Sequence, residues 1–190
     1  MPINVRSEIG ALEQVLLHRP GAELEQLVPG ELERLLFDDI PYLRAAQQEH
    51  DAFAALLREN GTQVVYLEEL MTQTLAVDPQ VRRRFVRQFI DEGGRIARHY
   101  QPALYDYLMA LDDRELVRRT MTGVSVEEFL PESQQGALVS MTRGSHRFVL
   151  DPIPKLYFTR DPFACIGHGV SLNAMYSATR RRETIYGQYI

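Results

Sequence analysis

The stretch of sequence that decides the fold reads Leu156-Tyr157-Phe158-Thr159-Arg160-Asp161-Pro162-Phe163-Ala164. It opens with an apolar, strand-like run, and the charged pair Arg160 and Asp161 follows at once. Pro162 then ends the strand, because proline has no N–H to donate to a sheet. Loops at strand ends often carry function because a rigid scaffold holds them in place. The stretch therefore predicts that the Asp161 carboxylate faces a binding cleft.

Five further segments accompany this stretch. They read Gly-His-Gly-Val-Ser-Leu-Asn at 167–173, Thr-Arg-Arg-Arg-Glu-Thr at 179–184, Ser-Glu-Ile-Gly at 7–10, Val-Leu-Leu-His-Arg-Pro-Gly at 15–21 and Leu-Leu-Phe-Asp-Asp-Ile-Pro at 35–41. Together the six segments closely resemble the arginine deiminases, which convert free L-arginine to L-citrulline and ammonia. The resemblance runs from about residue 5 to residue 190 and is weakest between residues 71 and 150.

The composition is that of an ordinary globular protein. Of its 190 residues, 45% are apolar and 25% are charged, which suffices to bury a core. The net charge of −5 argues against a nucleic-acid binder. A single cysteine excludes an internal disulfide framework and fits a reducing compartment. Neither a signal peptide nor a membrane-length apolar run is present, so we expect a cytoplasmic protein with no membrane partner.

The first 76 residues alternate strand and helix signals. Residues 14–17 predict a short buried strand, residues 27–37 a helix and residues 63–67 a second strand. Another helix is predicted between them, with Asp39 as its cap and Asn60-Gly61 as its end. One face of that helix carries Leu43, Ala46, His50, Phe53, Ala54 and Leu57. The order of elements indicates an α/β fold with a partly parallel sheet.

Residues 77–131 differ from what precedes them. They are dense in charged residues, carry apolar residues at helical intervals and predict a small, all-helical subdomain inserted into the α/β domain. Gly93-Gly94 is expected to break its first helix, and Gln101-Pro102 to start another. Residues 132–190 return to the α/β domain through a loop-rich segment that lasts until Pro154. Strands follow at residues 156–158 and 165–172, and a last helix begins at Ser177.

The resemblance implies a larger fold than these 190 residues can complete. Arginine deiminases form a five-bladed α/β propeller of the pentein type, with an inserted helical bundle, and are roughly twice this length. Their nucleophilic cysteine and catalytic histidine lie in the later half. We therefore expect a partial propeller, the N-terminal part of a deiminase, ending within an amphipathic helix.

Asp161 and Arg180 are the principal site residues that the resemblance implies. In the family, the aspartate that matches Asp161 grips the substrate guanidinium, because paired N–H donors fit the two oxygens of a carboxylate. The arginine that matches Arg180 binds the substrate carboxylate. The alternative for Asp161 is an ion pair with Arg160 or a turn cap before Pro162. Arg181 and Arg182 are expected to be solvated, with Arg182 pairing with a nearby acid.

Three more residues are candidate substrate contacts. Phe158 is expected to stack on the guanidinium or to be a core residue. Lys155 stands where the family usually has asparagine, so it would attract the substrate carboxylate but repel its ammonium group. The alternative is that Lys155 points into solvent. Leu36 is expected to approach the substrate from the N-terminal loop, together with Phe37.

The remaining reactive side chains are assigned to structure. Cys165 lies between Ala164 and Ile166 in a predicted strand, and a buried apolar thiol is inert. His168 is expected in a hairpin turn between two glycines, and His18 and His50 are interpreted as structural. No spacing of His, Cys, Asp and Glu predicts a metal site, and no glycine loop predicts a phosphate site.

The function expected from these residues is that of an arginine deiminase of the arginine catabolic pathway, inactive as this segment alone. The family reaction uses a thiolate nucleophile and a histidine general acid–base, with no cofactor or metal. Its substrate is L-arginine, and a homo-oligomer is expected at full length. One alternative is a non-catalytic arginine-binding or subunit-interaction protein. Another is an amidinotransferase or a different guanidine-modifying relative.

Overall fold

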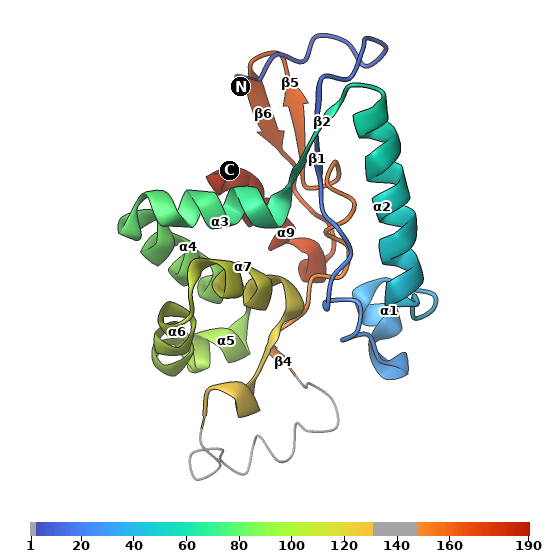
Figure 1. Cartoon of the computed structure of the whole chain (residues 1–190). Helices are drawn as coiled ribbons and strands as arrows, with labels where there is room; N and C mark the ends of the chain where they lie inside the picture. Colours follow the sequence, from blue (N-terminus) through green and yellow to red (C-terminus); the bar gives the residue numbers. More distant parts are fainter. Residues whose placement is uncertain (1–2, 131–147) are drawn as a thin grey trace.

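The computed structural model describes residues 3–130 and 148–190. Strand β1 (Gln14–Leu17) pairs in parallel with β2 (Gln63–Tyr66), so that Gln14 lies opposite Gln63 and Leu17 opposite Tyr66. Helix α2 (Leu43–Glu59) connects the two strands and lies beside them (Figure 1). The predicted strand, helix, strand order is therefore confirmed.

Two details of this N-terminal part differ from the prediction. The helix expected at residues 27–37 is short: a 3-10 turn, η1 (Pro29–Glu31), leads into α1 (Leu32–Leu35). Asp39 does not cap α2, which begins after Tyr42 without a side-chain cap. Pro41 disfavours helical backbone at the residue before it, so the helix starts later. Gly61, with φ of +83°, ends α2 as predicted.

The predicted helical segment contains helices throughout. Its helices are α4 (Pro79–Asp91), α5 (Arg95–His99), α6 (Gln101–Ala110) and α7 (Asp113–Thr122), and α3 (Leu67–Val77) precedes them. Asp78 caps α4 by accepting from the Gln80 N–H at 2.7 Å. The break at Gly93-Gly94 and the start at Gln101 are confirmed, and Gly94 has a φ of +95°. Helix α3 was not predicted, because β2 passes directly into it without a side-chain cap.

The main hydrophobic core lies among helices. It joins α3, α4, α6 and α7 with the C-terminal helix α9 (Glu183–Tyr189) (Figure 1). Phe85, Phe89 and Tyr186 are fully buried at its centre. The rings of Phe85 and Tyr186 are 6.0 Å apart, and the Tyr186 hydroxyl donates to Thr120 Oγ1 at 3.0 Å. Apolar burial between α4 and α9 thus fixes the segment that carries the arginine triplet.

The remaining strands form two antiparallel pairs. Strand β3 (Val124–Ser125), followed by the 3-10 turn η2 (Val126–Glu128), pairs with β4 (Phe148–Leu150). Strand β5 (Phe163–Ile166) pairs with β6 (Gly169–Leu172). The 3-10 turn η4 (Ala178–Arg180) follows Ser177, so the last α-helix begins later than predicted. Most of the loop predicted to begin at Pro131 lies outside the described residues.

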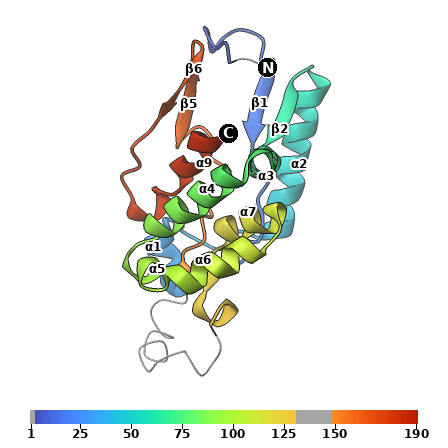
Figure 2. The same ribbon diagram turned by 90° about the vertical axis from the view of Figure 1, so that its left-hand side faces the viewer.

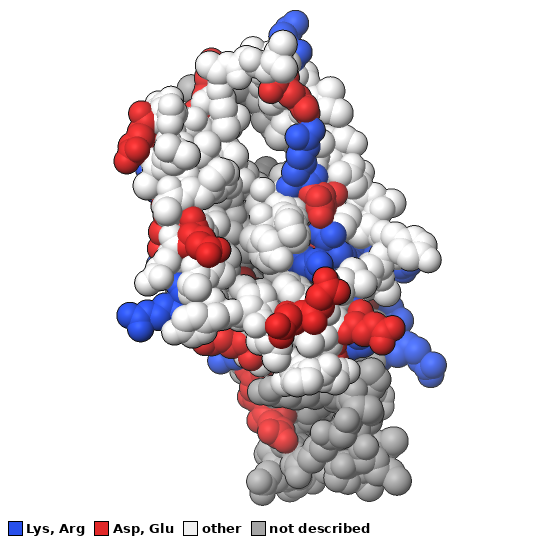
Figure 3. Space-filling model, turned by 90° about the vertical axis from the view of Figure 1, so that its right-hand side faces the viewer, with Lys and Arg blue, Asp and Glu red and all other residues white. Residues whose placement is uncertain are grey.

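The sheets stay separate, with two strands each (Figure 2). The mixed α/β class is confirmed, whereas the described residues contain no closed sheet, so the propeller remains a prediction. Within residues 3–130 and 148–190, no helix has both the length and the apolar character that a membrane crossing requires. Basic and acidic side chains lie next to one another on the face shown in Figure 3.

Candidate active site

The decisive stretch is a run of turns as far as Pro162, where β5 follows, and the strand predicted at residues 156–158 is wrong. Successive backbone hydrogen bonds, from Phe158 N–H to the Lys155 carbonyl (3.0 Å) and from Asp161 N–H to the Phe158 carbonyl (3.1 Å), fold it back on itself. Two prolines, Pro152 and Pro154, precede it and cannot donate to a neighbouring strand. The Thr159 hydroxyl donates to the Leu16 carbonyl at 2.9 Å, which fastens the run to β1.

Asp161 and Arg180 are brought together at the end of this run. An Arg180 terminal nitrogen lies 3.0 Å from Asp161 Oδ2. The same guanidinium donates two hydrogen bonds of 2.8 Å to the carboxylate of Glu183. Asp161 is 46% exposed, whereas Arg180 is 16% and Glu183 only 1% exposed at the side chain. The site is therefore one guanidinium held between a buried and an exposed carboxylate.

Burial and pairing act against each other in this cluster. Burial, the largest single effect, lowers the pKa of Arg180, but the hydrogen bonds and charges of Glu183 and Asp161 together raise it further, so the net shift is upward. Burial raises the pKa of Glu183, and the Arg180 guanidinium offsets part of that shift. Since Glu183 is buried and gripped at both oxygens, it is the fixed anchor of Arg180. Asp161 is the more exposed of the two carboxylates.

The backbone of Asp161 is held by Asn173, just after β6. The Asn173 side-chain amide donates to the Asp161 carbonyl at 2.8 Å, and its backbone N–H donates to the Pro162 carbonyl at 2.9 Å. The alternative that Asp161 pairs with Arg160 is not what the structure has. Arg160 instead forms an exposed ion pair with Glu8. The Asp161 carboxylate is thereby left to Arg180.

Lys155 does not point freely into solvent. Its ammonium nitrogen lies 4.8 Å from the ring centroid of Phe37 and 5.8 Å from that of Phe158. Both distances fall within the range of a cation–π contact. Phe158 is 44% exposed, so it is a surface ring rather than a core residue. The lysine is therefore in contact with both rings.

Leu36 lies at the C-terminal end of α1, next to Phe37. It has φ of +63° and is 46% exposed. A non-glycine residue in the left-handed region is strained, and such strain often accompanies function. Leu36 thus stands beside the ring that Lys155 contacts.

The structure revises the prediction for Cys165 and supports that for His168. Cys165 is exposed on β5, not buried, because the outer face of the β5–β6 hairpin is uncovered in the described residues. His168 lies in the hairpin turn with its Nδ1 3.0 Å from the Ile3 carbonyl, and Arg6 contacts its other ring nitrogen. His18 is buried against Glu23 at 2.9 Å. Within the described residues, no group of three or more metal-ligating side chains could hold an ion.

Two residues in contact with Arg180 or Asp161 were given no role from the sequence, and the solvent exposure of a third was predicted wrongly. Glu183 has a signal, since it stands three residues after Arg180, which is the spacing of side chains on one helical face. Asn173 is an amide directly after a strand. Arg182 was predicted to be solvated, but it is buried, because it precedes the helix whose Ile185 and Tyr186 enter the core. Arg181 is exposed as predicted.

Comparison with known proteins identifies the family. The arginine deiminase family profile matches residues 33–190. An arginine deiminase of Treponema denticola is 53% identical over 189 residues, which are 99% of this chain and 46% of that protein. An arginine deiminase of Streptococcus pyogenes serotype M3 is 53% identical over an alignment of 192 residues, which covers 100% of this chain and 46% of that protein. This chain spans about half the length of these curated relatives. It belongs to the arginine deiminase family.

Proposed function

We propose that this chain supplies the N-terminal half of the active site of an arginine deiminase, an enzyme that converts L-arginine and water to L-citrulline and ammonia. The observation that carries the proposal is that Asp161 already accepts a guanidinium, that of Arg180, at 3.0 Å. The family resemblance adds the substrate class. In this proposal the substrate guanidinium takes the place of Arg180 on the exposed carboxylate.

The neighbouring residues then receive distinct roles. Arg180, still anchored by Glu183, turns its released N–H groups to the substrate carboxylate. Phe158 offers a ring face to the planar guanidinium. Lys155 attracts the carboxylate and repels the ammonium group, and Leu36 bounds the site from the end of α1. Asp161 holds and polarises the guanidinium for nucleophilic attack.

We place the nucleophilic cysteine and the catalytic histidine outside these 190 residues, so that the chain alone is inactive. Cys165 lies opposite Val170 in the hairpin, and the His168 ring contacts Ile3 and Arg6. The two are therefore not arranged as a nucleophile and its base. The relatives' greater length supports the same placement.

The proposal extends to the organisation of the protein. Residues 77–131 are an inserted helical subdomain between the α/β parts 1–76 and 132–190, and the complete family fold is a pentein propeller. The protein is placed in the cytoplasm and forms a homo-oligomer at full length. Its pathway is arginine catabolism.

The direct test is citrulline formation from L-arginine by the purified chain, with Cys165→Ser as the control. We expect no turnover from either. Turnover that disappears in Cys165→Ser would overturn the proposal, because the short chain would then be a complete enzyme with Cys165 as its nucleophile.

A further inference from the structure

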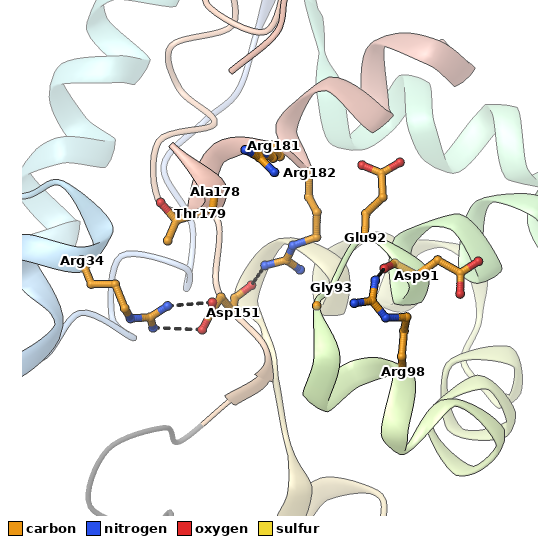
Figure 4. Close-up of a pocket in the computed structure, with 11 residues that line it drawn as sticks. Arg34, Asp91, Glu92, Gly93, Arg98, Asp151, Ala178, Thr179, Arg181 and Arg182 are labelled. Carbon is orange, nitrogen blue, oxygen red and sulfur yellow. Dashed lines mark hydrogen bonds and ion pairs between the residues drawn. The ribbon is translucent and has the colours of Figure 1, made fainter. Parts of the chain in front are cut away.

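A cavity lies beside the arginine triplet, and Arg181 and Arg182 are among its lining residues. It has a volume of about 670 Å³, which is in the range of small-molecule sites. Its lining includes Arg34, Arg98, Arg181 and Arg182, with Asp151 between the first and the last (Figure 4). Asp161, Arg180 and Glu183 are not among its lining residues. The cavity is therefore separate from the candidate active site.

One wall of this cavity is firmly packed. A Cβ atom at Gly93 would lie 2.5 Å from Leu150 Cδ2 and 2.8 Å from Ala97 Cβ. Leu150 and Ala97 are both fully buried. The turn between α4 and α5 is consequently pressed against the core, and only glycine fits there. The wall is preformed rather than assembled by a ligand.

Arg182 brings a buried charge to the cavity, and the charges of Asp151 and Glu92 offset part of the cost of its burial. Its guanidinium donates one hydrogen bond, of 2.7 Å, to the Asp151 carbonyl and lies 5.0 Å from the centroid of the Phe89 ring. Its Nη1 is buried and has no hydrogen-bond partner among the described residues. Burial lowers the pKa of Arg182, which expresses the cost of a charge removed from water. A buried guanidinium with an unused donor favours an added anion.

The carboxylates at the cavity do not meet this need. Asp151 is gripped at both oxygens by Arg34, at 2.7 and 2.9 Å. Glu92 accepts from Gln88 and is exposed. Arg98 donates to the Asp91 carbonyl, and Arg181 is exposed at the rim. With Arg34 paired to Asp151, three arginines and two carboxylates, Asp91 and Glu92, remain in the lining of the cavity.

We propose that this cavity binds a phosphate group, with Arg182 at its base and Arg98 and Arg181 at its rim. A phosphate offers two negative charges and several acceptor oxygens, so it can pair with more than one guanidinium, whereas a monocarboxylate offers one charge and two oxygens. Inorganic phosphate and a phosphate monoester share this chemistry. The proposal stands on the cavity alone and is independent of arginine turnover.

The test is calorimetric titration of the 190-residue chain with inorganic phosphate and with glycerol 3-phosphate, at constant ionic strength. We expect saturable binding of at least one. Arg181→Gln and Arg98→Gln should each raise Kd roughly tenfold, as loss of one charged hydrogen bond does. Arg44→Gln, an exposed change on α2 away from the cavity, should leave Kd unchanged. Tighter binding of the monoester would identify a phosphorylated metabolite, and tighter binding of phosphate a free-phosphate site.

Arg182→Met tests the base of the cavity, with circular dichroism reporting whether the variant is folded. If Arg182→Met is unfolded, Arg98→Gln and Arg181→Gln still test the proposal. Absence of saturable binding would overturn the proposal. Equal weakening of phosphate binding in Arg44→Gln would also overturn it, because the binding would then be general attraction to the surface. A parallel titration with malonate gives the third outcome: tighter binding of malonate than of either phosphate would overturn the proposal as well.

Discussion

The helical core and the turn that carries Asp161 are held in place by different forces. Phe85, Phe89 and Tyr186 are 0% exposed and are held by apolar contact. Asp161 is 46% exposed, and its surroundings depend on single hydrogen bonds from Asn173 and Thr159 and on the Arg180 pair. Stability is therefore concentrated in the helices, and changes at the site should affect binding more than folding.

The largest effect should come from the core. Phe85→Ala removes a fully buried ring that contacts Phe89, Tyr186 and Tyr189, and should lower the free energy of unfolding by ~3–5 kcal/mol. Urea denaturation followed by circular dichroism measures it. Phe53→Ala, at an α2 position that is 51% exposed, is the control and should cost less than ~1 kcal/mol. Similar losses in both variants would contradict the separation of core and surface.

Local signals predicted those parts of the fold that local physics determines. Strands β1 and β2 follow from short apolar runs, and the helix end at Gly61 and the break at Gly94 follow from glycines with positive φ. The strand at residues 156–158 failed for a tertiary reason. Phe158 and Asp161 donate to backbone carbonyls three residues earlier, and Thr159 is tied to β1. A run of apolar residues does not distinguish these arrangements.

The second largest effect should be on L-arginine binding at Asp161. Asp161→Asn should weaken L-arginine binding by the chain roughly 10- to 100-fold, because a neutral amide no longer pairs with a guanidinium. Calorimetry measures the affinity, and the melting temperature should change little. Arg160→Gln is the matched control, since it neutralises the adjacent residue and breaks only the exposed Glu8 pair. Equal loss in Arg160→Gln would argue against a specific role for Asp161.

Lys155→Asn should have a smaller effect, in the opposite direction. Removing a positive charge near the substrate ammonium should strengthen L-arginine binding about fivefold, since two charges 4 Å apart in water interact by about 1 kcal/mol. The lost contacts with Phe37 and Phe158 should cost ~0.5–1 kcal/mol of stability. Arg87→Gln, which removes a similar contact with Tyr105, controls for that loss. Weaker binding in Lys155→Asn would mean that the attraction of the lysine for the substrate carboxylate outweighs its repulsion of the ammonium group.

The sequence did not predict which charged side chains of the site contact one another. The resemblance pointed to Asp161 and Arg180, but it assigned them to opposite ends of a substrate, whereas here they contact each other. The partner that fixes Arg180 could not be named, because burial of Glu183 depends on how α9 packs. The same packing buries Arg182. Charged residues are rarely buried, so Arg182 was predicted to be solvated.

The smallest effect should come from a surface pair with similar geometry. Arg19 donates to both oxygens of Asp51, at 2.7 and 2.8 Å, as Arg180 does to Glu183, but the side chains are 42% and 51% exposed. Exposed pairs are screened by water, so Asp51→Asn should lower the free energy of unfolding by less than ~1 kcal/mol at pH 7.

The sign of the pH dependence of this pair sharpens the contrast. Hydrogen bonding to Arg19 lowers the pKa of Asp51 below its ordinary value of 3.8. The unfolded chain therefore takes up the proton first as pH falls. The contribution of Asp51 is complete above about pH 4–5 and is lost as pH falls through the folded-state pKa. Urea midpoints of the wild type and Asp51→Asn should differ slightly at pH 7, and the difference should shrink as the pH falls below 3.8. A difference that grows on acidification would mean that the charged form of Asp51 destabilises the fold. The contrast between the exposed Arg19–Asp51 pair and the more buried Arg180–Glu183 pair would then not be explained by exposure.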